Sequence, residues 1–144
     1  MFVTPEIRDV LDGVTSMTGF PDAEATTVND RYMVGHLISV SRTRDRAAVL
    51  KKIDNADAVW SFAYRKPRPG WRLIGRFLER DAFVGLSMKS RSFLGRDENA
   101  FTDEAWEVVK AWNQLLPGLD PVRSDDVEDL LSPLFWDLDN DDDG

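Results

Sequence analysis

Residues 58–91 constrain the fold of this chain more than any other segment. The first run, residues 58–64, places an aromatic side chain at every second position, which is typical of a strand with one aromatic face. A turn rich in proline follows, and residues 71–78 and 82–89 then read as two further strands. Because the connections between the three runs are short, they predict an antiparallel meander.

Helical patterns flank this predicted meander on both sides. Thr4 and Pro5 are typical of a helix start, and Phe101 and Thr102 mark a second one. Residues 31–41 alternate and favour a fourth strand, although a helix also fits them. The expected helices cover residues 5–17, 43–53 and 101–116, with a short one from 124 to about 132, while residues 21–30 are polar and turn-rich.

These patterns together predict one α+β domain. Its core is a three- to four-stranded antiparallel sheet packed by N-terminal and C-terminal helices. The length of 144 residues suits a single domain, and no repeat or linker divides it. We expect the domain to cover residues 1–136, with an acidic, disordered tail at residues 137–144.

The charge of the chain is divided unevenly along its length. The net charge of −8 combines −4 in residues 1–41, +9 in residues 42–96 and −13 in residues 97–144. The middle part carries 14 basic and 5 acidic residues, and the last part carries 2 basic and 15 acidic ones. Such asymmetry suggests an anionic partner for the basic part, or neutralisation of one part by the other within the fold.

The basic residues fall on or beside the predicted meander, where aromatic residues are interleaved with them. Basic groups neutralise phosphates and aromatic rings stack on unpaired bases, so this sheet is a candidate surface for single-stranded RNA or DNA. In the competing interpretation, the aromatic rings face the core and the arginines form a solvated rim. The candidate anion-binding residues are Arg65, Lys66, Arg68, Arg72, Arg76, Lys89, Arg91 and Tyr64.

An enzymatic alternative follows from the order of the predicted elements. A strand and a helix, then three antiparallel strands and a helix, resembles the RelE-type ribonuclease toxins, and the resemblance lies in element order alone. It implies cleavage of RNA by basic and acidic side chains without histidine. No residue is assigned a catalytic role, and we expect a protein that is not an enzyme.

Metal and cofactor chemistry has few candidate residues in this sequence. The chain has no cysteine and one histidine, His36, which reads as structural, so we expect no transition-metal site and no cofactor. Asp139 to Gly144 begin like a calcium loop but lack the later carboxylate. Without a signal peptide or a long apolar run, the expected location is the cytoplasm.

The C-terminal segment offers a second candidate surface. Three large apolar residues, Leu134, Phe135 and Trp136, stand among acids and either dock into an unknown partner or pack on the domain itself. We therefore expect a regulatory or interaction protein with a basic sheet for an anionic partner. Its acidic C-terminal segment masks that sheet or docks a protein. A structural role in an assembly is a further alternative.

Overall fold

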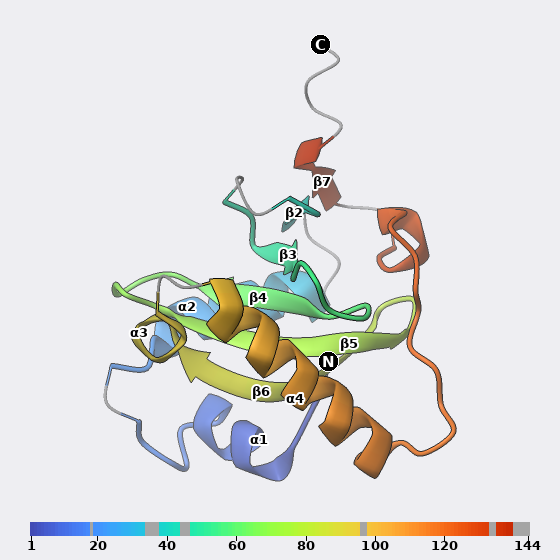
Figure 1. Cartoon of the computed structure of the whole chain (residues 1–144). Helices are drawn as coiled ribbons and strands as arrows, with labels where there is room; N and C mark the ends of the chain where they lie inside the picture. Colours follow the sequence, from blue (N-terminus) through green and yellow to red (C-terminus); the bar gives the residue numbers. More distant parts are fainter. Residues whose placement is uncertain (18, 34–37, 44–46, 96–97, 133–134, 140–144) are drawn as a thin grey trace.

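A single mixed sheet forms the centre of the molecule (Figure 1). The structure is a computed structural model and describes residues 1–17, 19–33, 38–43, 47–95, 98–132 and 135–139. Within these residues, seven strands follow the order β1-β6-β5-β4-β3-β2-β7. They are β1 (Phe2–Val3), β2 (Ile38–Ser41), β3 (Leu50–Lys52), β4 (Trp60–Tyr64), β5 (Trp71–Glu79), β6 (Ala82–Ser90) and β7 (Phe135–Asp137).

The predicted meander is present as β4, β5 and β6, which pair antiparallel. The ladder between β5 and β6 is irregular beside Gly75. A Cβ atom on Gly75 would lie 1.9 Å from the carbonyl oxygen of Val84, so the two backbones approach more closely than any side chain permits. The bounds of β4, β5 and β6 agree with the three runs predicted from the sequence, so the prediction of these central strands is confirmed.

The prediction of a three- to four-stranded antiparallel sheet is wrong. β1 pairs in parallel with β6, and β2 pairs in parallel with both β3 and β7. β2 lies within the strand expected at residues 31–41, whose first three residues belong to α2 instead. β1, β3 and β7 are two or three residues long, too short for an alternation pattern to stand out. Their partners are distant in sequence or are joined to them without a tight turn, so no hairpin signal marks the pairing.

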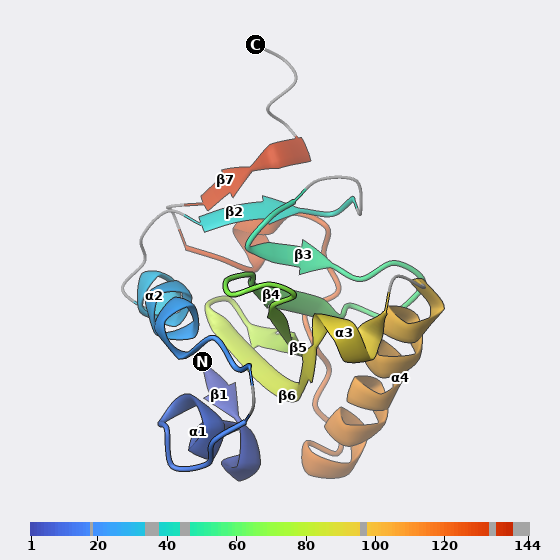
Figure 2. The ribbon, with the colours of Figure 1, turned by 90° about the vertical axis from the view of Figure 1, so that its left-hand side faces the viewer.

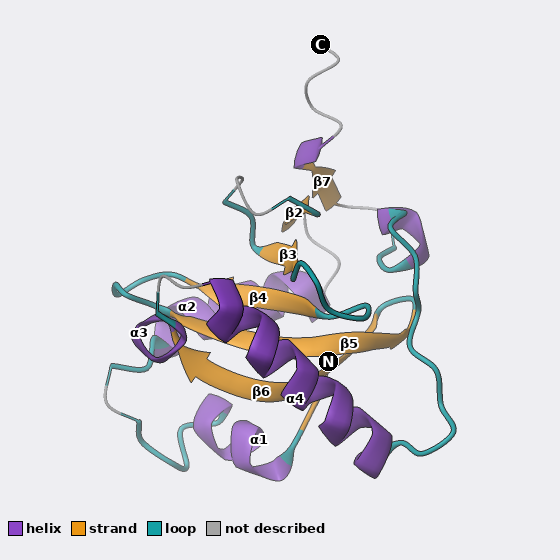
Figure 3. Ribbon diagram, viewed as in Figure 1, coloured by secondary structure: helices purple, strands orange, loops and turns teal. Residues whose placement is uncertain are grey.

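The helices also differ from the sequence expectations. They are α1 (Pro5–Leu11), α2 (Asp22–Met33), α3 (Arg91–Leu94), α4 (Glu98–Leu115) and the 3₁₀ helix η1 (Val127–Asp129), all shown in Figure 3. The polar, turn-rich segment at 21–30 is largely α2, whose apolar face is narrow and carries Ala25 and Val28. Part of the helix expected at 43–53 lies at residues 44–46, outside the described chain; residues 47–49 are irregular and residues 50–52 form β3, because Leu50 enters the core from a strand.

Helices cover both faces of the sheet (Figure 2). On one face, α1, α2 and η1 enclose the larger core, which contains the aromatic side chains of β4 and β5. Phe62 packs edge-on against Phe83 with ring centroids 4.8 Å apart. On the other face, α3 and α4 pack on a smaller core built around Ile74 and Val108. This second face will be called the α4 face.

The described part of the chain shows no helix with the length and apolarity needed to cross a membrane. The boundary expected between the domain and its tail, after residue 136, falls inside β7. Asp137 and Asp139 both contact the sheet edge. The calcium-like stretch lies largely at 140–144, outside the described residues.

Candidate anion-binding site

A pocket of about 540 Å³ opens on the α4 face, over β3, β4 and the first residues of β5. β4 presents only two small side chains to this face, Ser61 and Ala63. The start of α4 closes one side of the pocket with Phe101 and Thr102. The pocket exists because Ser61 and Ala63 are small and because α3 and α4 do not cover this part of the sheet.

Three arginines line this pocket: Arg65, Arg72 and Arg91. Arg65 follows β4 and donates from Nη2 to the carbonyl oxygen of Ala48, 2.8 Å away. Arg72 lies opposite Ala63 in the β4–β5 ladder and donates from Nη1 to the carbonyl oxygen of Trp71 at 3.0 Å. Both hydrogen bonds go to neutral backbone groups, so neither of them offsets a positive charge with a carboxylate.

Arg91 is the first residue of α3, and its guanidinium lies 5.1 Å from the centre of the Phe101 ring. Its Nη1 atom is buried and has no hydrogen-bond partner among the described residues. Within that part of the chain, none of the three arginines forms an ion pair with a carboxylate. A buried donor without a partner costs free energy until a ligand or water satisfies it.

The electrostatics of the pocket follow from this arrangement. Burial, followed by the charges of Arg65 and Arg91, lowers the pKa of Arg72 to about 10, while Glu24 on α2 acts in the opposite direction. Burial also lowers the pKa of Arg65, again with Glu24 opposing the shift. Arg72 remains protonated at neutral pH, so the pocket carries concentrated positive charge.

Two lysines and one aspartate complete the charged lining. Lys52 forms an ion pair with Asp125 of the acidic C-terminal segment. Lys51 lies on the pocket side of β3, opposite Ser61, and Asp54 follows β3. The sequence placed residues 43–53 in a helix, so these side chains were missed as site residues. The concentration of basic residues in this part of the chain is the sequence signal by which Lys51 and Lys52 could have been identified.

Arg76 does not belong to the pocket, although it is on the same strand and face as Arg72. Its side chain is only 1% exposed and lies under α4, with the guanidinium 5.3 Å from the Trp112 ring. Nη2 is 3.1 Å from the carboxylate of Asp57, which also pairs with Arg123. Arg76 is therefore a neutralised structural cation rather than an anion-binding residue.

The remaining predicted basic residues are dispersed. Lys66 and Arg68 are exposed in the turn between β4 and β5, and the Lys66 backbone N–H donates to the Glu24 carboxylate. Lys89 lies opposite Arg72 in the β5–β6 ladder, but its amine is 4.9 Å from the centre of the Phe93 ring. Lys89 lines a different hollow, between α1 and α4.

Tyr64 and the neighbouring tryptophans point away from the pocket. Tyr64 is fully buried in the larger core, and its hydroxyl donates to Asn29 Oδ1 at 2.7 Å. Trp60 and Trp71 belong to the same core. The assignment of Tyr64 to the anion-binding surface is therefore corrected: strand alternation sends the aromatic rings to one face and the arginines to the other.

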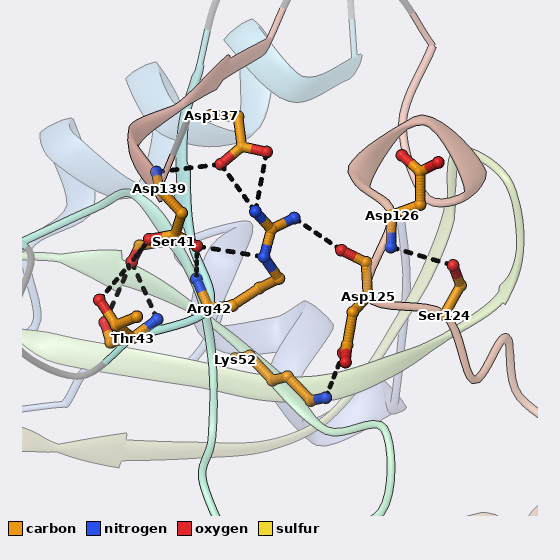
Figure 4. A network of polar contacts seen from close by, with 9 residues as sticks. All are labelled: Ser41, Arg42, Thr43, Lys52, Ser124, Asp125, Asp126, Asp137 and Asp139. Atoms are coloured by element: carbon orange, nitrogen blue, oxygen red, sulfur yellow. Dashed lines mark hydrogen bonds and ion pairs between the residues drawn. The ribbon is translucent and has the colours of Figure 1, made fainter. Parts of the chain in front are cut away.

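The acidic C-terminal segment neutralises Arg42, which follows β2 and does not line the pocket (Figure 4). The Arg42 guanidinium lies 3.0 Å from Asp137 and 3.1 Å from Asp139, and its Nη1 donates to the carbonyl oxygen of Asp125. Asp139 also accepts hydrogen bonds from the Ser41 hydroxyl and the Arg42 backbone N–H. These contacts hold β7 against β2.

The predicted docking residues of this segment are only partly described. Phe135 is half-buried and packs against the larger core of the domain itself. Trp136 is the central residue of β7, and Leu134 lies outside the described residues, as does His36. Docking of a partner by this segment stays a prediction. In the described ranges, no group of three or more His, Asp or Glu side chains is placed to hold a metal ion.

Comparison of the chain with known protein families, with curated proteins and with solved structures found no match.

Proposed function

We propose that this protein is a non-enzymatic binding protein that takes an anionic group of its partner into the pocket formed by Arg65, Arg72 and Arg91. The observation that carries the proposal is the convergence of three guanidinium groups without a paired carboxylate in the described chain. Guanidinium groups bind phosphates and carboxylates through paired, charge-assisted hydrogen bonds. The fold keeps these groups together despite their repulsion, which a bound anion would relieve.

The position of the C-terminal segment refines the idea that it masks the basic sheet. Its described carboxylates Asp137 and Asp139 pair with Arg42 at the β2 edge, and Asp125 pairs with a residue of the pocket, Lys52. We propose that the segment weakens anion binding through this one contact rather than by covering the arginines.

Binding of sulfate and inorganic phosphate to the full chain tests the proposal. Calorimetric titration at about 20 mM salt limits screening of the site. Loss of one charge-assisted hydrogen-bonding group costs about 1.5–3 kcal/mol, so we expect Arg72→Ala to weaken binding at least tenfold.

Arg31→Ala is the matched control, because Arg31 is an exposed arginine in the last turn of α2. It removes the same charge without altering the pocket and should leave binding unchanged. Equal weakening in both variants would mean that only the overall charge matters. Absence of any anion binding at low salt would overturn the proposal.

A further inference from the structure

The shape of the basic cluster restricts the kind of anion that it suits. Arg65, Arg72 and Arg91 come from the end of β4, the start of β5 and the start of α3, and they line one pocket rather than a groove. A nucleic-acid strand carries single negative charges spaced along its backbone and is bound by basic groups that follow it. Three guanidinium groups around one hollow, which Lys51 and Lys52 also line, instead match one group with more than one negative charge.

Two basic residues of the same strands, Arg76 and Lys89, do not extend the cluster into a track. Arg76 is neutralised by Asp57 under α4, and Lys89 lines another hollow beside Phe93. The aromatic rings of β4 and β5 are buried on the opposite face. Arg76, Lys89 and these rings are therefore not available beside the three arginines to bind a single-stranded nucleic acid.

The rest of the pocket suits an organic body attached to the anion. Its volume of about 540 Å³ lies within the range of small-molecule sites, roughly 300–1,000 Å³. Ile53 and the ring of Phe101 supply apolar surface, and Asn55 and Thr102 supply polar groups. A bare inorganic ion would leave most of this space to water.

Building on the proposed anion-binding function, we infer that the ligand is a small organic phosphate monoester, whose terminal phosphate lies among Arg65, Arg72 and Arg91 and whose organic body extends toward Phe101. A phosphate monoester carries close to two negative charges at neutral pH, because its second pKa is about 6. A phosphodiester carries one. The monoester therefore matches the convergent cluster better, and it occupies the space beside the arginines.

Phenyl phosphate and methyl phenyl phosphate are matched probes, since they share a ring and differ in charge. With the full chain at about pH 7.5, one extra charge at a partly buried site should make phenyl phosphate bind at least fivefold more tightly, a difference of about 1 kcal/mol. Binding of a single-stranded RNA with a 5′-hydroxyl end is measured in parallel, since this RNA carries phosphodiesters and no 5′-terminal phosphate monoester. Tighter binding of the diester or of this RNA, with loss in Arg72→Ala, would overturn the inference and leave the proposed function standing.

The pH dependence gives an independent readout. Lowering the pH from about 7.5 to about 5.5 should weaken phenyl phosphate binding by up to roughly fourfold, because the ligand takes up its second proton. Sulfate stays a dianion over this range, so its affinity should not change. Sulfate therefore reports any change that arises in the charged groups that face or influence the pocket; among the described residues they are Lys51, Lys52, Asp54, Arg65, Arg72, Arg91 and Glu24. Equal weakening of sulfate would assign the change to the protein and overturn this part of the inference.

Phe101→Leu tests the position of the organic body while retaining apolar packing at the start of α4. It should weaken phenyl phosphate binding about threefold, the range of one aromatic contact, and leave inorganic phosphate binding unchanged. Unchanged binding of both phenyl phosphate and inorganic phosphate would contradict the inferred position of the organic body beside Phe101. If no anion binds the wild-type chain, both the inference and the proposed function fail; if sulfate binds but phenyl phosphate does not, only the inference fails.

Discussion

Arg72 and Arg76 lie four residues apart on the same strand and face, yet their surroundings are opposite. Arg76 is buried under α4 with Asp57 as its partner and Trp112 against its guanidinium. Arg72 faces a hollow, where its charged neighbours include two other arginines. Arg76 is thus a cation that the fold uses in its own packing, whereas the charge of Arg72 faces the pocket.

The difference arises from what covers each half of the face. α4 crosses β5 and β6 and brings Trp112 over Arg76, whereas only the start of α4 reaches the pocket. Burying a charge costs several kcal/mol unless an opposite charge accompanies it. Arg76 has that opposite charge; Arg72 is only partly buried and shares its surroundings with like charges. Under the proposed function, a bound anion would offset the repulsion between Arg72 and these like charges.

The largest effect should be the difference in the free energy of unfolding between Arg76→Ala and Arg72→Ala. Arg76→Ala creates a cavity beneath Trp112 and removes a partner of Asp57, so it should lower the free energy of unfolding by about 3 kcal/mol. Arg72→Ala removes repulsion and opens no enclosed cavity, so it should change that free energy by less than about 0.5 kcal/mol. Urea unfolding at neutral pH measures both. Equal costs would show that Arg72 is as structural as Arg76.

A smaller effect on the free energy of unfolding should appear at acidic pH. The hydrogen bond from Arg123, with the charges of Arg123 and Arg76, lowers the pKa of Asp57 below its ordinary value. A depressed folded-state pKa contributes stability above the unfolded value, near 4, and this contribution is lost as the pH falls through the folded-state pKa.

Stability measured between about pH 5 and pH 2 should therefore decrease less steeply in Asp57→Asn than in the wild type. Arg72→Ala should retain the wild-type dependence, because Arg72 is not among the groups that shift the pKa of Asp57. A wild-type slope in Asp57→Asn would contradict the assigned role of this carboxylate.

The smallest effect should come from the contact between the C-terminal segment and the pocket. Asp125→Asn removes the charge that pairs with Lys52, so phosphate should bind about twofold more tightly at low salt, within the range of exposed ion pairs. Asp126→Asn is the matched control: it changes the net charge equally, and asparagine can still cap η1. Identical gains in both variants would assign the effect to net charge alone.

The sequence predicted the parts of this fold that depend on local patterns. β4, β5 and β6 follow from alternation and short turns, and most of α4 from the helix-start signals at Phe101 and Thr102. α2 was missed because threonine and asparagine interrupt a narrow apolar face. β1, β3 and β7 were missed, as was the parallel pairing of β2, because the stability of these short strands comes from distant partners, which no local pattern records.

The candidate site was predicted in part for the same reason. Alternation on β5 indicates that Arg72 and Arg76 share a face, but it does not indicate that α4 covers one of them. Arg91 and Phe101 meet only because α3 turns the chain between β6 and α4. Charge clustering in sequence thus identified the basic face, and the packing of one helix selected which arginines remain available.

The two outermost strands, β1 and β7, come from opposite ends of the described chain. During synthesis, β1 must wait for β6 before it can pair, and the free edge of β2 stays open until residues 135–137 have left the ribosome. An open strand edge is a template for association with other chains. A chain shortened before β7 would keep that template permanently, so removing the acidic segment would alter self-association as well as charge.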